Sequence, residues 1–461
     1  MQKNIPLSLS IQREIEKHRL NMESEIDKSM DRLGLRTILN QSGIRKEKGY
    51  APISVLFVLM LLPFLKQGVR ALWVNHYCSR FLNAQKDTIY RFLNHYGFNW
   101  RKFVTLLVNR ILAITDTSPL NDRVLIVDDS VLPKTGKEME LVSYHHDHKT
   151  NRSQLGYQML QLGYHNKTQF FPIDAAFHTS KNRPNQTVRS LDKRSNGWKR
   201  RQETFRKKTE VLLEMLQRCF RNGIDARFVL FDSWFANDGL LANIVEIGYG
   251  VICRLKATKT RYTYQGKAWT LKELWHEVAR HRLQPVPGWN IKAAVLNVNL
   301  PLSGTVRLVF VRWTKKQWHC FLCTEIDLEP EEILNYYARR WAIEVYFRDA
   351  KQMLALGQGQ SECFDALIAW TSIVMIRYLL LVYMLAGKQG MSSSIGPLFE
   401  QLAQQHLELT VMPVLMDRLR QVFMMSSLLF QETSETENLL YMLDLIDNAI
   451  CHKPMNSCAK L

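Results

Sequence analysis

The stretch "RVLIVDDSVL" (residues 123–132) places two adjacent aspartates directly after a run of branched apolar residues. Such a run is typical of a β-strand buried in a sheet. Side chains alternate along a strand, so Asp128 lies on the same side as Val124 and Ile126, and Asp129 on the other. A carboxylate at the end of a buried strand is costly unless a cation pairs with it. The stretch therefore predicts a core strand that ends at a charged site.

The residues that follow predict a mixed sheet. Two more strands are expected close behind, at residues 155–165 and 168–178. An amphipathic helix, a strand, a helix and another strand come next, at residues 207–223, 226–236, 237–248 and 249–258. Three consecutive strands followed by helix, strand, helix and strand is the order of an RNase H-like core, an α/β fold with a mixed sheet flanked by helices.

The pattern changes again on either side of this core. Residues 8–115 have helical patterns, and Lys86, Thr88, Arg91 and Asn94 in one of them suit a DNA groove, although an ordinary helical bundle explains them equally well. Short alternating strands fill the segment before residue 325. We predict five regions: a helical N-terminal DNA-binding region (1–118), the first part of the core (119–256), a β-rich insertion (257–325), the final core helices with a third acid (326–388), and a helical C-terminal region with a possible role in dimer contacts (389–461).

Two further acids have settings that resemble that of Asp128. Asp232 follows four apolar residues in "RFVLFDSWF" (227–235). Glu344 lies in "YYARRWAIEVYFRDAK" (336–351), which is expected to be one helix. At about 100° per residue, Glu344 shares an arc of about 80° on that helix with one tyrosine and three basic residues. The residues on this face are Tyr337, Arg340, Glu344, Arg348 and Lys351. A surface ladder of salt bridges is the alternative interpretation. Together the three acids offer the hard oxygen ligands that Mg²⁺ or Mn²⁺ prefers.

The charge of the chain predicts a polyanionic partner. Among 461 residues, Lys and Arg number 61 against 43 Asp and Glu, which gives a formal net charge of +18. Residues 181–208 contain 11 of these basic residues and only two acids. A solvated charged surface is the alternative, but the density favours contact with DNA phosphates. The basic residues predicted to make these contacts are Lys199, Arg200, Arg201, Lys207 and Lys208.

Several other classes of function lack support. Residues 366–386 are apolar enough to span a membrane, but Arg377 near their centre favours a buried core helix. The N-terminal residues have no signal-peptide pattern, and the eight cysteines are scattered, as expected for a cytosolic protein. Neither the histidines at 145, 146 and 148 nor the Cys320–Cys323 pair has convincing zinc spacing. Phosphate-loop and dinucleotide-binding glycine patterns are absent, so no nucleotide cofactor is expected.

On these motifs the sequence resembles the DDE transposases of bacterial insertion sequences. It is most similar to the insertion-sequence-four family, whose signature Y-x2-R-x3-E-x6-K is matched by Tyr337, Arg340, Glu344 and Lys351. The segments "IVDDS" and "FDSWF" match the first-acid and second-acid motifs of that family, D-x-[ST] and D-x-x-F. The resemblance covers about residues 120–386.

The resemblance implies a metal-binding triad of Asp128, Asp232 and Glu344 that holds two ions of Mg²⁺ or Mn²⁺. Asp129 is the rival for the first position. Asp128 is preferred because Ser130 follows at the D-x-[ST] spacing and because Asp128 shares a strand face with apolar residues.

The resemblance also implies how DNA is held. Tyr337, Arg340 and Lys351, with Arg348 beside them, are expected to bind phosphates near the cleaved end. Members of the family that open DNA through a hairpin stack a flipped base on a tryptophan of the β-rich insertion. Trp318 is the first candidate here and Trp313 the second, and a core tryptophan of the insertion is the alternative for either.

The implied protein is a DNA transposase, located in the bacterial cytoplasm with the nucleoid. It would bind the terminal inverted repeats of its element and carry out metal-dependent strand cleavage and strand transfer as a homodimer on paired double-stranded DNA ends, for cut-and-paste transposition. No membrane partner is expected. The alternatives are an RNase H-like nuclease or resolvase that cuts without joining, and a catalytically inactive DNA-binding protein derived from a transposase.

Overall fold

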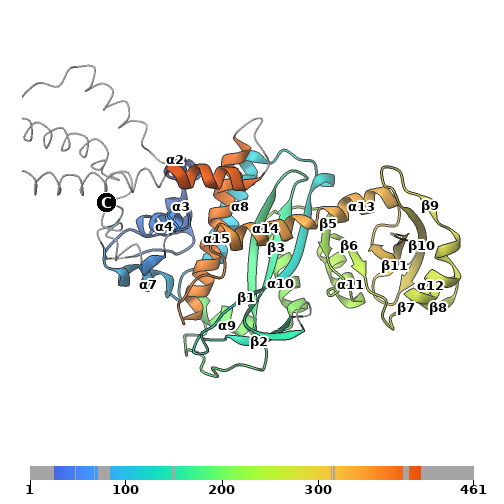
Figure 1. Cartoon of the computed structure of the whole chain (residues 1–461), viewed down its shortest axis with the longest axis horizontal. Helices are drawn as coiled ribbons and strands as arrows, with labels where there is room; N and C mark the ends of the chain where they lie inside the picture. The colour runs from blue at the N-terminus through green and yellow to red at the C-terminus, as the bar shows by residue number, and fades with distance from the viewer. Residues whose placement is uncertain are drawn as a thin grey trace, which may run out of the picture. The chain divides into compact units, whose positions relative to one another are not determined.

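The computed structural model describes residues 25–46, 48–66, 68–70, 82, 84–147, 151–312, 314, 317–387 and 394–405. The chain divides into two compact units, one made of residues 94–386 and the other of residues 1–93 with 387–461 (Figure 1). The C-terminal tail from residue 406, Trp313 and His148 lie outside the described residues.

The described part of the second of these units is helical. The residues 395–405 form one helix. Four helices come from the N-terminal segment: α2 (Glu25–Arg32), α3 (Leu35–Gln41), α4 (Pro52–Leu61) and α7 (Lys86–Leu93). Helix α4 begins at a proline, which suits the first turn of a helix, and most of its side chains are buried. Thr88 on α7 is one of the four polar residues considered for a DNA groove. It is buried, so its side chain points into the protein.

The larger unit is built around the predicted sheet. Strands β1 (Val124–Pro133), β3 (Arg152–His165) and β4 (Phe170–His178) are antiparallel neighbours, while β5 (Phe228–Phe231) and β6 (Gly250–Leu255) run parallel to β1. The spatial order is β4-β3-β1-β5-β6. This mixed order is that of an RNase H-like core, which confirms the fold class predicted from the sequence. A short strand, β2 (Ser143–Asp147), pairs with the first residues of β3 in a hairpin.

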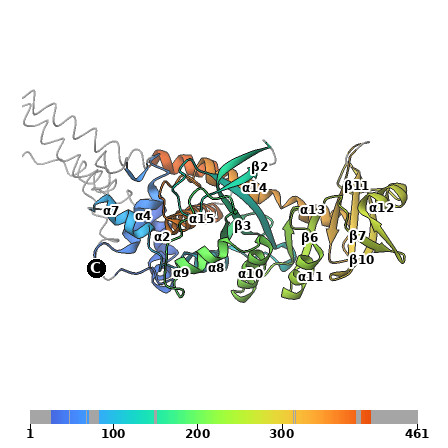
Figure 2. The same cartoon turned by 90° about the horizontal axis from the view of Figure 1, so that it is seen from below.

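Helices cover both faces of this sheet, which explains the continuous apolar runs in its strands. Residues Val124–Val127 of β1 and all four residues of β5 are buried. Figure 2 shows α10 (Lys208–Arg221) and α11 (Asp238–Ile247) on one side of the sheet and the third-acid helix on the other. Helix α11 has a local start signal, because the side chain of Asn237 accepts a hydrogen bond from the Leu240 amide.

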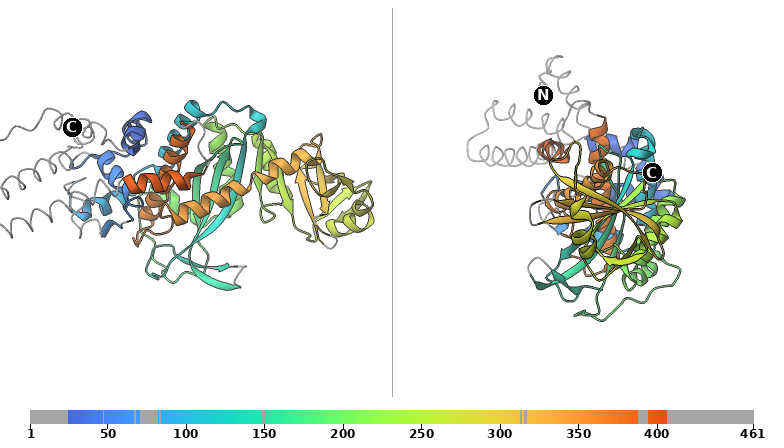
Figure 3. Two further views of the ribbon diagram at one scale, coloured as in Figure 1. Left: turned by 45° about the horizontal axis from the view of Figure 1, so that its top comes forward. Right: turned by 90° about the vertical axis from the view of Figure 1, so that its right-hand side faces the viewer.

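The β-rich segment extends the same sheet. Strand β12 (Trp318–Cys323) pairs antiparallel with β6, and the order continues β12-β11-β10-β7-β8. Figure 3 shows the strands of this segment in yellow. A capped helix, α12 (Leu271–Glu277), and two short elements, η2 (Ala279–His281) and β9 (Gln284–Pro285), join these strands. The remaining strands are β7 (Arg261–Tyr264), β8 (Lys267–Thr270), β10 (Lys292–Leu300) and β11 (Gly304–Arg312).

The segment predicted as one helix around Glu344 is two helices. Helix α13 (Pro330–Ala338) ends at a turn formed by Arg339 and Arg340, and α14 (Trp341–Gln352) starts after it. Both turn residues keep right-handed helical dihedral angles, and Arg340 still pairs with Glu344 and lies over the Tyr337 ring, so these three side chains stay together across the break between the helices. In Figure 1, α13 and α14 run in series from the insertion strands to the core strands.

The long apolar helix α15 (Phe364–Ala386) lies inside the larger unit. It packs against β4, α14 and α8 (Trp100–Thr115). It is the one helix of the described residues that is long and apolar enough to cross a membrane, and 83% of its most apolar window is buried in protein. Arg377 is fully buried, donates to the Leu354 carbonyl at 2.7 Å and lies over the Trp370 ring. This packing agrees with the interpretation of the segment as a core helix. Helix α8 belongs to this unit, whereas the predicted boundary at residue 118 assigned it to the N-terminal region.

Candidate active site

Asp128 and Glu344 converge on a single guanidinium group. Arg340, in the turn between α13 and α14, donates from Nη1 to Oδ2 of Asp128 at 3.0 Å. Its Nη2 donates to Oε1 of Glu344. Asp128 is positioned by the buried part of β1 and Glu344 by the first turn of α14. Two of the three predicted acids are thus brought together by packing of α14 against β1.

Burial and neighbouring charge make Asp128 an unusual carboxyl. Its pKa is raised to about 6, chiefly by burial; Arg340 and the Asp129 amide oppose the rise, and the negative charges of Asp129 and Glu344 add to it. A second carboxylate in the same site disfavours ionisation of the first, as expected for groups that share one cation. The site therefore favours binding of additional positive charge.

Asp232 reaches the same edge of the sheet from the neighbouring strand. The β1–β5 pairing ends with Ile126 opposite Leu230, and two residues farther on Asp128 is level with Asp232. Oδ1 of Asp232 accepts a hydrogen bond from the Ser233 amide at 2.6 Å and lies 3.2 Å from Nη2 of Arg254 on β6. Arg254 was not singled out from the sequence. The one feature of the sequence that could have indicated Arg254 is its position on the predicted strand that follows the strand before Asp232.

Tyr337 lies between the two acid-bearing regions. Burial raises its pKa to about 12, and both Arg340 and Asp232 are close enough to influence it. The Arg340 guanidinium is 5.9 Å from the centre of its ring, and Phe321 of β12 packs edge-on against it at 4.8 Å. The ring therefore connects the third-acid helices to the insertion.

Asp129 has different partners on the opposite side of β1. Its Oδ2 lies 2.5 Å from Nζ of Lys208 at the start of α10, and it accepts a hydrogen bond from Gln158 of β3 at 3.0 Å. The alternation of side chains predicted for this strand thus separates the two aspartates. Asp128 faces α14 and Asp129 faces α10.

The two remaining bases of the signature region take up separate positions. Nζ of Lys351 donates to the Ser130 hydroxyl at 2.7 Å and to the Val131 carbonyl at 3.3 Å, so it lies against the end of β1. Arg348 pairs with its neighbour Asp349, and 57% of its side chain is exposed. Lys351 is therefore beside the acids, whereas Arg348 projects toward solvent.

Two of the basic residues predicted to bind DNA are structural instead. Arg201 is 1% exposed, and its guanidinium donates to both oxygens of Glu140 at 2.7 Å and to both oxygens of Asp365 at 2.9 and 2.8 Å. Arg200 donates to Glu203 and to the Ala175 carbonyl, and 12% of its side chain is exposed. The prediction of phosphate contact by Arg201 and Arg200 is wrong because both guanidinium groups lie in the interior and pair with carboxylates there.

The other cations of that stretch differ in exposure. Lys199 and Lys207 are exposed, and they remain candidates for phosphate contact. The Lys208 side chain is only 10% exposed and is paired with Asp129.

Trp318 is packed within the insertion. Its ring stacks on Trp275 at 5.2 Å with an angle of 15° between the planes, and Phe310 lies at 5.8 Å. This arrangement matches the alternative of a core tryptophan more closely than that of a free stacking surface. The cysteines of this segment, Cys320 and Cys323, are buried thiols whose pKa values are raised by burial.

The carboxylates of this site offer oxygen ligands for a divalent cation. The part of the chain that the structure describes contains no group of three or more His, Cys, Asp or Glu side chains gathered closely enough to hold a metal ion. Asp128 and Glu344 nevertheless share one positive charge, and carboxylate oxygens are the donors that Mg²⁺ prefers. These two residues fit a hard cation that displaces Arg340. Asp232 would join them by leaving Arg254.

Two protein-family models match the chain. One, described as a DDE superfamily endonuclease, matches residues 75–273, and the other, a transposase DDE domain, matches residues 206–380. No curated protein sequence matches it. Among solved structures it is similar to the Drosophila P element transposase strand transfer complex, at 13% identity and a TM-score of 0.23. The match covers 55% of this chain and 55% of that one, so the chain corresponds to about half of its neighbour.

Proposed function

We propose that the chain is a DNA transposase of the insertion-sequence-four type, a proposal supported by its matches to a DDE superfamily endonuclease and a transposase DDE domain. It binds the terminal inverted repeats of its element, cuts one strand there, and uses the freed 3′-hydroxyl for strand transfer. The observation that carries the proposal is the convergence of Asp128 and Glu344 on Arg340, with Asp232 on the adjacent strand end.

Asp128, Asp232 and Glu344 would hold Mg²⁺ or Mn²⁺, two ions in each active site. Bound there, the ions supply activation of a water or a 3′-hydroxyl and stabilisation of the leaving oxygen of a phosphodiester. The raised pKa of Asp128, about 6, still leaves it ionised at neutral pH, so the carboxylate is available as a ligand.

Arg340, Tyr337 and Lys351 would hold the DNA backbone beside these acids. Arginine offers a fork of donors that fits a phosphate, and lysine offers a point charge. A phosphate near Arg340 would compete with the two carboxylates for its guanidinium. DNA binding would thereby release Asp128 and Glu344 for the cation. Arg348 is more exposed and would contact phosphates farther along the duplex.

Two protomers would act on two element ends in a paired complex, because each end needs an active site and both ends must be joined to one target. Lys199 and Lys207 are exposed and would contribute to holding the duplex.

The decisive experiment uses a labelled duplex that carries an end of the element encoding the chain, incubated with Mg²⁺. Wild-type protein is compared with Glu344→Gln and with Glu246→Gln, a matched change of an exposed glutamate on α11. Cleavage at the element end that is lost only in Glu344→Gln supports the proposal. Equal cleavage by both variants contradicts the triad. Cutting without any joined product, or cutting that ignores the terminal repeat, would instead identify a nuclease or resolvase.

A further inference from the structure

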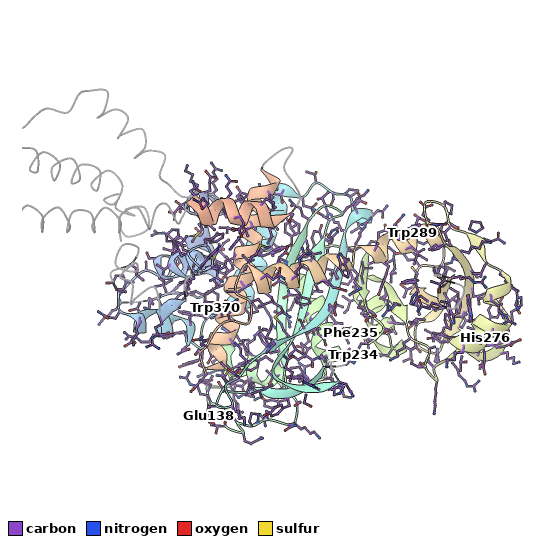
Figure 4. The ribbon with its side chains drawn as sticks, viewed as in Figure 1. Glu138, Trp234, Phe235, His276, Trp289 and Trp370 are labelled. Atoms are coloured by element: carbon purple, nitrogen blue, oxygen red, sulfur yellow. The ribbon has the colours of Figure 1, made fainter. Side chains whose placement is uncertain are left out.

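Lys208 contacts two residues, Asp129 and Trp234, that lie close in sequence to two predicted metal ligands. Nζ of Lys208, in the first residue of α10, lies 2.5 Å from Oδ2 of Asp129 and 4.1 Å from the centre of the Trp234 ring. Asp129 directly follows Asp128 in β1. Trp234 lies two residues after Asp232 in the turn that follows β5, beside Phe235 (Figure 4).

The two strand ends need such a connection because their backbone pairing stops short of the acids. The register between β1 and β5 ends at Ile126 and Leu230. Beyond this pair no ladder hydrogen bonds fix the separation of Asp128 from Asp232. A metal site tolerates only small errors in ligand position, so another contact has to set this distance.

The surroundings of Lys208 suit this connecting role. Its side chain is only 10% exposed, and Gln158 donates to the same carboxylate oxygen of Asp129 at 3.0 Å. His145 and His178 lie near, and burial lowers the pKa of both, that of His145 to about 4, so they are neutral at pH 7. Lys208 is thus the cation that balances Asp129, and its partly desolvated ammonium is also attracted to the face of the Trp234 indole.

We propose that Lys208 is a positioning residue that fixes the spacing of the β1 and β5 ends, and through it the spacing of Asp128 and Asp232, and that it does not bind DNA. The inference rests on the proposed function, since it concerns the metal ligands of the same site. It replaces the sequence-based expectation that Lys208 contacts phosphate. The charge of Lys208 is matched by Asp129 and its side chain is covered, so little of its ammonium group is accessible to the phosphate backbone of DNA.

The test compares Lys208→Met with Lys207→Met, the adjacent lysine whose side chain is exposed. For each purified full-length variant, Mn²⁺ affinity is measured without DNA by electron paramagnetic resonance, and DNA affinity is measured without metal over a range of salt concentrations. Loss of a residue that orients a metal ligand typically weakens metal binding by about 10-fold to 100-fold. Loss of a phosphate contact lowers the salt slope of DNA binding by about one.

We expect Lys208→Met to weaken Mn²⁺ binding at least about tenfold and to leave DNA affinity and its salt slope unchanged. Lys207→Met should show the opposite result. Lys208→Arg, which keeps the charge and can still reach Asp129 and Trp234, should recover most of the Mn²⁺ affinity. If Lys208→Met reduces the salt slope and leaves Mn²⁺ binding as in the wild type, Lys208 is a DNA contact and the inference is wrong.

A second comparison covers the case in which Lys208→Met folds poorly, which its thermal melting curve would reveal. Asp129→Asn keeps the shape of the partner and removes its charge. Asp129→Asn should weaken Mn²⁺ binding, and the double variant with Lys208→Met should bind Mn²⁺ no more weakly than Asp129→Asn alone, because both changes break the same contact. If Asp129→Asn alone abolishes Mn²⁺ binding as completely as Asp128→Asn, then Asp129 is a ligand and the inference fails. Absence of DNA cleavage by the wild-type protein would count against the proposed function only, since the Mn²⁺ measurements do not depend on cleavage.

Discussion

Asp128 and Glu344 lie on different elements far apart in the sequence, yet both accept a hydrogen bond from the Arg340 guanidinium. One organic cation thus neutralises two carboxylates that are predicted to hold an inorganic one. The same arginine belongs to the signature expected to bind DNA. A metal ion bound by the two carboxylates would compete with Arg340 for them. A DNA phosphate bound by Arg340 would instead release the carboxylates for the metal.

Replacing Arg340 by alanine should strengthen metal binding in the absence of DNA. The two carboxylates lose a competing partner, and a partly exposed ion pair is worth about 1 kcal/mol, or roughly fivefold in affinity. Mn²⁺ titration by calorimetry checks this. In the same variant, cleavage of an element end should fall because a phosphate contact is lost. Unchanged or weaker Mn²⁺ binding would show that Arg340 orients the ligands and does not compete with the ion.

The Asp128→Asn variant should gain stability relative to the wild type as the pH rises. The folded-state pKa of Asp128, about 6, lies above the ordinary value of 3.8, so folding favours the protonated acid. The contribution of Asp128 to stability is present below pH 4 and is lost as the pH passes through 6. An amide does not ionise and avoids this loss, which amounts to about 2–3 kcal/mol. Urea unfolding of metal-free protein at pH 4 and pH 7 measures it. A difference between the variants that does not change with pH would exclude a raised pKa.

Replacing Arg201 by alanine should destabilise the fold without a specific effect on DNA binding. The change leaves Glu140 and Asp365 buried without their cation, and breaking such a buried pair costs about 3–5 kcal/mol. Lys199→Ala, on the exposed surface of helix α9 (Asn196–Thr204), which also holds Arg201, is the control and should change stability by less than about 0.5 kcal/mol. Denaturant unfolding of both variants decides the matter. A stable Arg201→Ala protein with weakened DNA binding would restore the sequence-based expectation.

Trp318→Ala should destabilise the insertion before it affects DNA chemistry. The ring is stacked on Trp275 and packed near Phe310, and removal of a packed aromatic side chain costs about 3 kcal/mol. Trp318→Phe should restore most of this stability, as judged by thermal melting. If Trp318→Ala melts like the wild type and fails only to form hairpin DNA products, then Trp318 is the stacking surface implied by the family resemblance.

The sequence determined the core strands and the acids that follow them. Branched apolar runs fix β1 and β5 because only a strand covered on both faces buries every residue of such a run, and Asp128 and Asp232 follow from where the runs stop. Alternation along β1 was enough to separate Asp128 from Asp129. These are local properties of the chain, so a sequence pattern reports them.

Only the tertiary structure decided what the basic residues do. Arg201 and Lys207 look alike in the sequence, yet one is buried between two acids and the other is exposed. Likewise, a helical pattern gives no sign that the guanidinium of Arg340 reaches Asp128 as well as Glu344. The fate of a charged side chain depends on which distant carboxylates packing brings within about 3 Å, because the cost of burying a charge is recovered only through such contacts. Periodicity along the chain carries no information about them.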